Sequence, residues 1–149
     1  MTFKLTINQA LQQSDIARHE GRLDEVERLY REILKIEPKR ADINNNLGAI
    51  LYSNGSLDEA EIYYKKAIKL KPDYSIAHNN LGNTQLELGK LYDAEECYKK
   101  AIEFKSDYEE AYCNLGLIQQ SLNKFDEAER NYKKALVLKP SYVEVYKNL

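Results

Sequence analysis

Asn80-Leu81-Gly82 stands in the middle of the chain, and the same tripeptide recurs at 46–48 and at 114–116. Each copy follows the previous one after 34 residues, and the chain closes on Asn148-Leu149 at the same spacing. A fixed period of this length indicates a repeat protein, in which each unit packs mainly on its neighbours. The search for function therefore moves from a single catalytic pocket to a surface that recurs along the chain.

Three full blocks carry the repeat, at 41–74, 75–108 and 109–142. Apolar residues at helical spacing predict two helices in each block. Between the helices lies a glycine or an asparagine, which favours the left-handed backbone at a helix C-terminus. The shared positions are Gly48, Gly82 and Gly116 in the first helix, Gly55, Gly89 and Asn123 in the turn, and Ala60, Ala94, Ala128, Tyr64, Tyr98, Tyr132, Ala67, Ala101 and Ala135 in the second helix.

The glycines inside the first helices predict a close helix crossing. A glycine in a helix interior costs roughly 1 kcal/mol relative to alanine, so three of them in one position require a packing reason. Small residues let helices approach, and the tyrosine of the second helix can fill the space between neighbouring pairs. At the start of one second helix, Ser56 and Glu59 have the spacing of a capping box.

In these residues the chain resembles the tetratricopeptide repeat family. That family has a Leu-Gly in its first helix, the pattern Ala-x3-aromatic-x2-Ala in its second helix, and a closing proline, here Pro72 and Pro140. The resemblance implies an all-α fold, a right-handed α-solenoid of stacked helix-turn-helix repeats whose first helices line a concave groove. The family's tryptophan and tyrosine in the first helix are replaced, and we expect the replacements to make the inner surface individual; they are Asn44, His78, Tyr112, Leu51, Gln85 and Gln119.

The ends of the array differ from its middle. Residues 7–40 fit the register imperfectly and are predicted to form a divergent N-terminal repeat that caps the stack, ahead of the repeats at 41–74, 75–108 and 109–142. Residues 143–149 look like the start of a truncated further repeat. Because repeat arrays need a polar outer cap, we expect a fragment of a longer protein, or a homo-oligomer formed through the uncapped C-terminal end.

Asparagines recur along the groove that the resemblance implies. An amide side chain has a donor and an acceptor, so a ladder of asparagines can pair with the backbone of an extended peptide without reading its sequence. This ladder is similar to that inside the repeat domain of O-linked N-acetylglucosamine transferase. The alternative is that the amides satisfy neighbouring backbone groups. The predicted peptide-binding residues are Asn45, Asn46, Tyr52, Asn79, Asn80, Asn83 and Asn114.

A second binding mode of the family holds the C-terminal carboxylate of a chaperone with basic residues. At the expected basic positions this chain has Asn45, Glu110 and Asn114. Because these residues depart from the family's basic pattern and leave the groove neutral to acidic, we do not expect the carboxylate clamp here. A neutral or basic extended peptide suits the groove better.

Composition argues against nucleic-acid binding, membrane insertion and metal or redox chemistry. Lys and Arg total 22 against 24 Asp and Glu, a net charge of −2 that favours neither nucleic acid nor a membrane as partner. No apolar run approaches the roughly 20 residues that span a bilayer. The two cysteines have no metal or redox spacing, and we expect a cytoplasmic protein with no metal, no cofactor and no catalytic residues.

The predicted function is that of a protein–protein interaction scaffold that binds an extended peptide or partner segment and is not itself an enzyme. Two alternatives stay open. The chain could be the substrate-recruiting arm of a larger enzyme of the glycosyltransferase or sulfotransferase type, or a self-assembling solenoid module.

Overall fold

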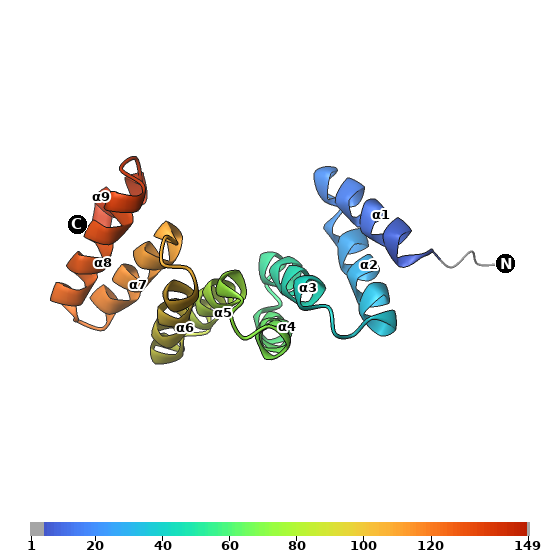
Figure 1. Cartoon of the computed structure of the whole chain (residues 1–149), viewed down its shortest axis with the longest axis horizontal. Helices are drawn as coiled ribbons and strands as arrows, with labels where there is room; N and C mark the ends of the chain where they lie inside the picture. The colour runs from blue at the N-terminus through green and yellow to red at the C-terminus, as the bar shows by residue number, and fades with distance from the viewer. Residues whose placement is uncertain (1–4, 149) are drawn as a thin grey trace. The chain divides into compact units, whose positions relative to one another are not determined.

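The computed structural model describes residues 5–148, which form nine α-helices and no strand (Figure 1). The chain divides into two compact units between Pro72 and Asp73. In each unit, helices that are consecutive in the chain pack as antiparallel pairs, so the predicted all-α class is confirmed. Unit 1 contains α1 (Ile7–His19), α2 (Leu23–Ile36), α3 (Ala41–Ser53) and α4 (Leu57–Leu70), and unit 2 contains α5 (Ser75–Glu87), α6 (Leu91–Phe104), α7 (Glu109–Ser121), α8 (Phe125–Leu138) and α9 (Val143–Asn148).

The turns inside the pairs have the left-handed backbone that the sequence predicts. Gly55 and Gly89 have φ angles of 83° and 73°, and Asn123 has a φ of 59°. The residue after each turn donates its backbone N–H back across the turn, as from Lys90 N to Gln85 O at 2.8 Å. This bond joins the end of the first helix to the start of the second, and it sets the direction in which the second helix leaves.

The predicted capping box at Ser56 is wrong. The Ser56 side chain makes no capping hydrogen bond, and its ψ of 61° keeps the hydroxyl away from the first turn of α4. Its backbone N–H is bound instead by Leu51 O at 2.8 Å. A true capping box begins α1, where Thr6 has an extended ψ of 158° and exchanges hydrogen bonds with Gln9. The turn geometry, rather than the residue type, decides whether a serine can cap.

Glycine and tyrosine meet where the two helices of a pair cross. A Cβ atom added to Gly48, Gly82 or Gly116 would lie 2.8, 2.7 or 2.6 Å from the nearest ring carbon of the tyrosine on the paired helix. These partners, Tyr64, Tyr98 and Tyr132, are all buried. The recurrent glycine is therefore required by the tyrosine ring that packs against its backbone.

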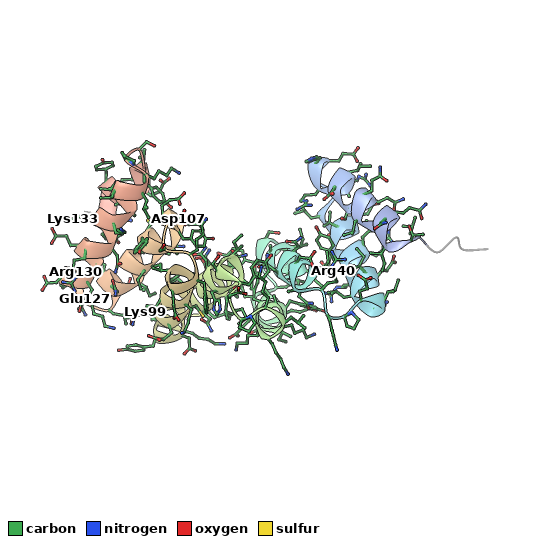
Figure 2. The ribbon with its side chains drawn as sticks, in the orientation of Figure 1. Arg40, Lys99, Asp107, Glu127, Arg130 and Lys133 are labelled. Carbon is green, nitrogen blue, oxygen red and sulfur yellow. The ribbon has the colours of Figure 1, made fainter. Side chains whose placement is uncertain are left out.

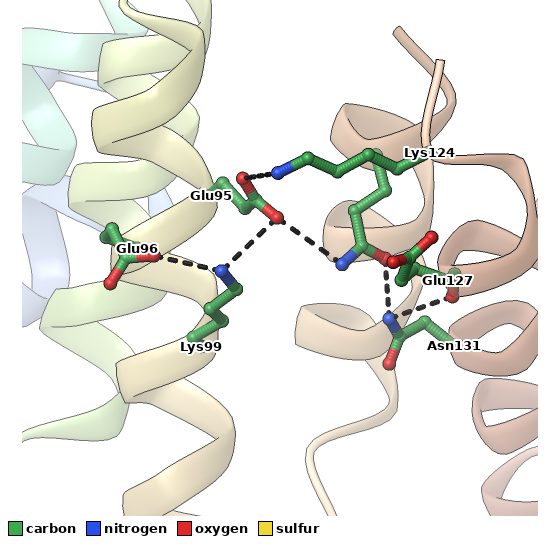
Figure 3. Close-up of polar contacts among 7 residues, drawn as sticks. Glu95, Glu96, Lys99, Lys124, Glu127 and Asn131 are labelled. Atoms are coloured by element: carbon green, nitrogen blue, oxygen red, sulfur yellow. Dashed lines mark hydrogen bonds and ion pairs between the residues drawn. The ribbon is translucent and has the colours of Figure 1, made fainter. Parts of the chain in front are cut away.

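A buried polar network couples successive repeats inside unit 2 (Figure 3). Glu95 of α6 is only 3% exposed and accepts hydrogen bonds from Lys124 Nζ at 2.7 Å and from Gln119 Nε2 at 3.4 Å. Gln119 of α7 in turn accepts from Asn131 Nδ2 of α8 at 2.6 Å. The network joins three helices through side chains whose polar atoms are all satisfied.

The residues that replace the family's tryptophan and tyrosine were expected to make the inner surface individual, and their burial corrects this expectation. Gln85 and Gln119 are each 4% exposed, and Asn44 and His78 are also buried. They lie between helices rather than on an inner surface. At these four positions the replacements thus distinguish the packing of each repeat, whereas Tyr112 is half-buried.

Replacing Glu95 by glutamine should destabilise unit 2. Burial raises the pKa of the Glu95 carboxyl, but the hydrogen bonds from Lys124 and Lys99 outweigh it, and the net pKa is lowered. A lowered folded pKa stabilises the fold above the unfolded pKa of about 4.3, and this contribution is lost as the pH falls through the folded value. We expect Glu95→Gln to lower the free energy of unfolding by about 2 kcal/mol at pH 7, and by less at pH 3.

The matched control is Glu96→Gln. Glu96 pairs with the same Lys99, at 2.9 Å, but its side chain is 69% exposed. Exposed ion pairs contribute about 0–1 kcal/mol, so this variant should stay close to the parent in urea unfolding at both pH values. Equal losses in the two variants would show that the buried network contributes nothing specific.

Candidate peptide-binding surface

Three of the predicted site asparagines lie together in unit 2. Asn80 and Asn83 are on α5, Asn114 is on α7, and all three are half-buried. Asn79 is 0% exposed. The Asn79 side chain therefore lies beneath the surface formed by the other asparagines, and it could contact a ligand only if the side chains that cover it moved.

Hydrogen bonds link these side chains into a chain across α5 and α7, which we call the amide network. Asn114 Nδ2 donates to Asn79 Oδ1 at 3.2 Å and to Asn83 Oδ1 at 3.1 Å. Asn79 Nδ2 donates to Glu110 Oε1 at 3.0 Å, and the Tyr98 hydroxyl donates to Asn83 Oδ1 at 2.8 Å. The residues of the amide network are Asn79, Asn83, Tyr98, Glu110 and Asn114.

The amide network fixes which atoms can meet a ligand. Both N–H groups of Asn114 are directed to α5, so its Oδ1 is the atom left to accept. Asn83 Oδ1 already accepts two hydrogen bonds, so its Nδ2 is the atom left to donate. Two neighbouring helices thus present one acceptor and one donor at half-buried positions. A peptide unit offers the complementary pair, an N–H and a C=O.

The sequence missed two members of this arrangement. Tyr98 was expected only to fill space, and Glu110 only to exclude a carboxylate ligand, yet each holds one asparagine in place. Asn83 could be recognised from the sequence, because a polar residue stands where the neighbouring blocks have the apolar residues Ala49 and Leu117.

The other predicted residues, Asn45, Asn46 and Tyr52, lie in unit 1. Asn45 is buried, and its Nδ2 lies 3.5 Å from Oδ1 of the half-buried Asn46. Tyr52, near the end of α3, is also half-buried. Within unit 1, the Asn45–Asn46 pair and Tyr52 therefore belong to the same helix.

Cys113 lies beside the amide network on α7 and is 6% exposed. Burial raises the pKa of its thiol, and the nearby carboxylates of Glu144 and Glu110 add to this effect. At neutral pH the group is therefore a thiol rather than a thiolate, and the thiolate is the nucleophilic form. Its surroundings favour a packing role.

Charges separate between the two kinds of helix. No lysine or arginine occurs in α3, α5 or α7, whose charged residues are Asp42, Glu87, Glu109 and Glu110. The second helices carry the cations, and Figure 2 shows Arg130 and Lys133 projecting outward from α8. Several of these lysines are paired one turn back, as Lys65 is with Glu61 at 2.7 Å. The helices α3, α5 and α7 therefore offer a polar surface whose only formal charges are negative.

Among residues 5–148, no helix is both long and apolar enough to cross a bilayer. Within the same residues, no three His, Cys, Asp or Glu side chains gather in a group that could hold a metal ion.

Comparison with solved structures reports the same fold in several proteins. A crystal structure of MamA has a TM-score of 0.86 and 26% identity, with 94% of this chain and 76% of that chain covered. YrrB, described as a tetratricopeptide repeat protein with an unusual peptide-binding site, has a TM-score of 0.83 at 17% identity, with 97% and 75% covered. At that identity the likeness to YrrB shows the fold alone.

A third structure is that of the first tetratricopeptide repeat domain of Spaghetti (RPAP3), bound to the HSP90 peptide SRMEEVD. It has a TM-score of 0.72 and 27% identity, with 73% of this chain and 86% of that chain covered. No curated protein sequence matches the chain at a significant level. Family models of the tetratricopeptide repeat match residues 39–107 and 109–142. The chain therefore belongs to the tetratricopeptide repeat family.

Proposed function

We propose that this chain is a protein-interaction module that binds an extended segment of a partner along the first helices of its repeats, without catalysing a reaction. The observation that carries the proposal is the pair formed by Asn83 Nδ2 and Asn114 Oδ1, a donor and an acceptor held by the amide network. Such a pair can bind the backbone of an extended peptide whatever its side chains. The RPAP3 domain, solved with a peptide bound, supports this mode for a relative of similar fold.

The charge of the surface favours a neutral or basic peptide. Along α5 and α7 the formal charges are those of Glu87, Glu109 and Glu110. Glu110 is exposed and makes no ion pair with the other described residues, so it is available to a cation of the ligand. Like charges across an interface are unfavourable. A peptide with several acidic residues, such as SRMEEVD, is therefore expected to bind poorly here.

Selection from a library of random peptides tests the proposal with the full chain. We expect the selected peptides to be enriched in lysine and arginine, and SRMEEVD to bind at least about tenfold more weakly than the best of them. Glu87→Lys, which leaves the acceptor of Asn79 in place, should weaken the preference for basic peptides, whereas Glu103→Lys, on the exposed part of α6, should leave it unchanged. Failure to select any peptide, or selection of acidic sequences, would contradict the proposal.

A further inference from the structure

A cavity of about 350 Å³ lies in unit 1, on the side of the second helices. Leu34 and Pro38 supply apolar walls. Arg31, Lys35 and Lys66 bring three cationic groups to the lining, and the Tyr63 side chain also lines the cavity. No part of the proposed peptide surface belongs to it. The cavity therefore needs an explanation of its own.

The cations are ordered around the Tyr63 ring. Lys66 Nζ lies 4.5 Å and Arg31 Cζ 5.8 Å from the ring centroid. Arg31 Nη1 also lies 3.3 Å from the Tyr63 hydroxyl and donates to it. Because the hydroxyl accepts this bond, its own proton is left to donate to a ligand. The ring and the guanidinium thus form one wall with a donor at its edge.

The positive charge of the cavity comes from its lysines. Arg31 is paired with Glu27 at 2.9 Å and with Glu59 at 2.8 Å, so its charge is offset while its position is fixed. Lys35 and Lys66 make no ion pair with any other residue that the structure describes. Two uncompensated positive charges therefore face one small space.

The corresponding place in unit 2 is not built in this way. Two repeats further along the chain, Glu103 occupies the position of Lys35, and Asn131 occupies the position of Tyr63. Glu103 is paired with Lys100 at 2.6 Å, and Asn131 donates to Gln119. Two repeats on, Lys35 and Tyr63 therefore have no lysine or tyrosine counterpart in unit 2.

We propose that this cavity binds a phosphate monoester. A phosphate dianion matches the two uncompensated lysines, and its oxygens can accept from both ammonium groups and from the Tyr63 hydroxyl. A carboxylate, with one charge, would leave one lysine unmatched. Leu34 and Pro38 would contact the organic group of the ester. The source is either a phosphorylated side chain of a partner or a free phosphorylated metabolite.

Titration calorimetry of the full chain at low salt tests this site with three probes: a phosphoserine peptide, the same peptide with glutamate in place of phosphoserine, and glycerol phosphate. We expect saturable one-to-one binding of a phosphate probe, weakened about tenfold by Lys35→Gln and by Lys66→Gln, as for a charge-assisted hydrogen bond. Binding of the phosphopeptide alone identifies a modified partner as the source, and equal binding of glycerol phosphate identifies a metabolite.

The matched control is Lys134→Gln, which removes the exposed lysine at the position of Lys66 in the fourth repeat. It should bind as the parent does. Circular dichroism should show that all the variants remain folded, since the substituted lysines are exposed. Absence of saturable phosphate binding, equal affinity for the glutamate peptide, or an equal loss in Lys134→Gln would overturn the proposal.

Discussion

Gly82→Leu is expected to lower the free energy of unfolding by about 3 kcal/mol, because inserted atoms in a packed interior force neighbouring groups out of position. A Cβ atom at this position would already lie 2.7 Å from Cε1 of Tyr98 and 3.0 Å from its Cζ. The ring is fully buried and has no open side to move into. Urea unfolding followed by circular dichroism measures the loss.

The control for this substitution is Glu87→Leu, which places the same side chain at an exposed position of the same helix. It should change the free energy of unfolding by no more than about 0.5 kcal/mol. The smaller change Gly82→Ala should be tolerated better in a Tyr98→Leu background, where the ring is absent. A Gly82→Leu variant as stable as the parent would show that the close crossing is not needed.

The fold could be predicted from the sequence because its determinants recur. The glycine of the first helix and the tyrosine of the second meet in every full repeat, and three copies at one spacing identify them without an alignment. The turns were predictable for the same reason, since a left-handed backbone selects glycine or asparagine.

The candidate site was only partly predictable, because it depends on contacts between repeats. Asn79 and Asn80 are adjacent, and the sequence assigned both to the groove, yet one is fully buried and the other half-exposed. A helix turns by 100° per residue, so the packing of α7 decides which of two neighbours is covered. The partner of Asn79 is Glu110, 31 residues away, and no local pattern indicates it.

The same packing changes how the asparagines should be tested. Alanine at Asn114 would leave Asn79 Oδ1 and Asn83 Oδ1 without the donor they share, and Asn79 is buried. Such a variant would lose stability along with any ligand, since an unsatisfied buried group costs about 1–3 kcal/mol. A sharper variant must alter only the atom that the amide network leaves for a ligand.

Asn83→Asp is that variant, and we expect it to weaken peptide binding about 30-fold. Aspartate keeps the oxygen that accepts from Tyr98 and Asn114, and it exchanges the Nδ2 donor for an acceptor. A peptide carbonyl would then face a carboxylate and lose its hydrogen bond, a change of about 2 kcal/mol. Salt of about 0.5 M screens the long-range attraction of the new charge for a basic peptide.

The most direct test of the account is the dissociation constant of a selected peptide for Asn83→Asp and for the parent, at that salt concentration. Gln13→Glu, which adds the same charge to an exposed position of α1, is the control. We predict about 30-fold weaker binding to Asn83→Asp, unchanged binding to Gln13→Glu, and equal melting temperatures for all three proteins. Equal dissociation constants for Asn83→Asp and the parent would contradict the claim that the amide network presents a peptide-binding surface.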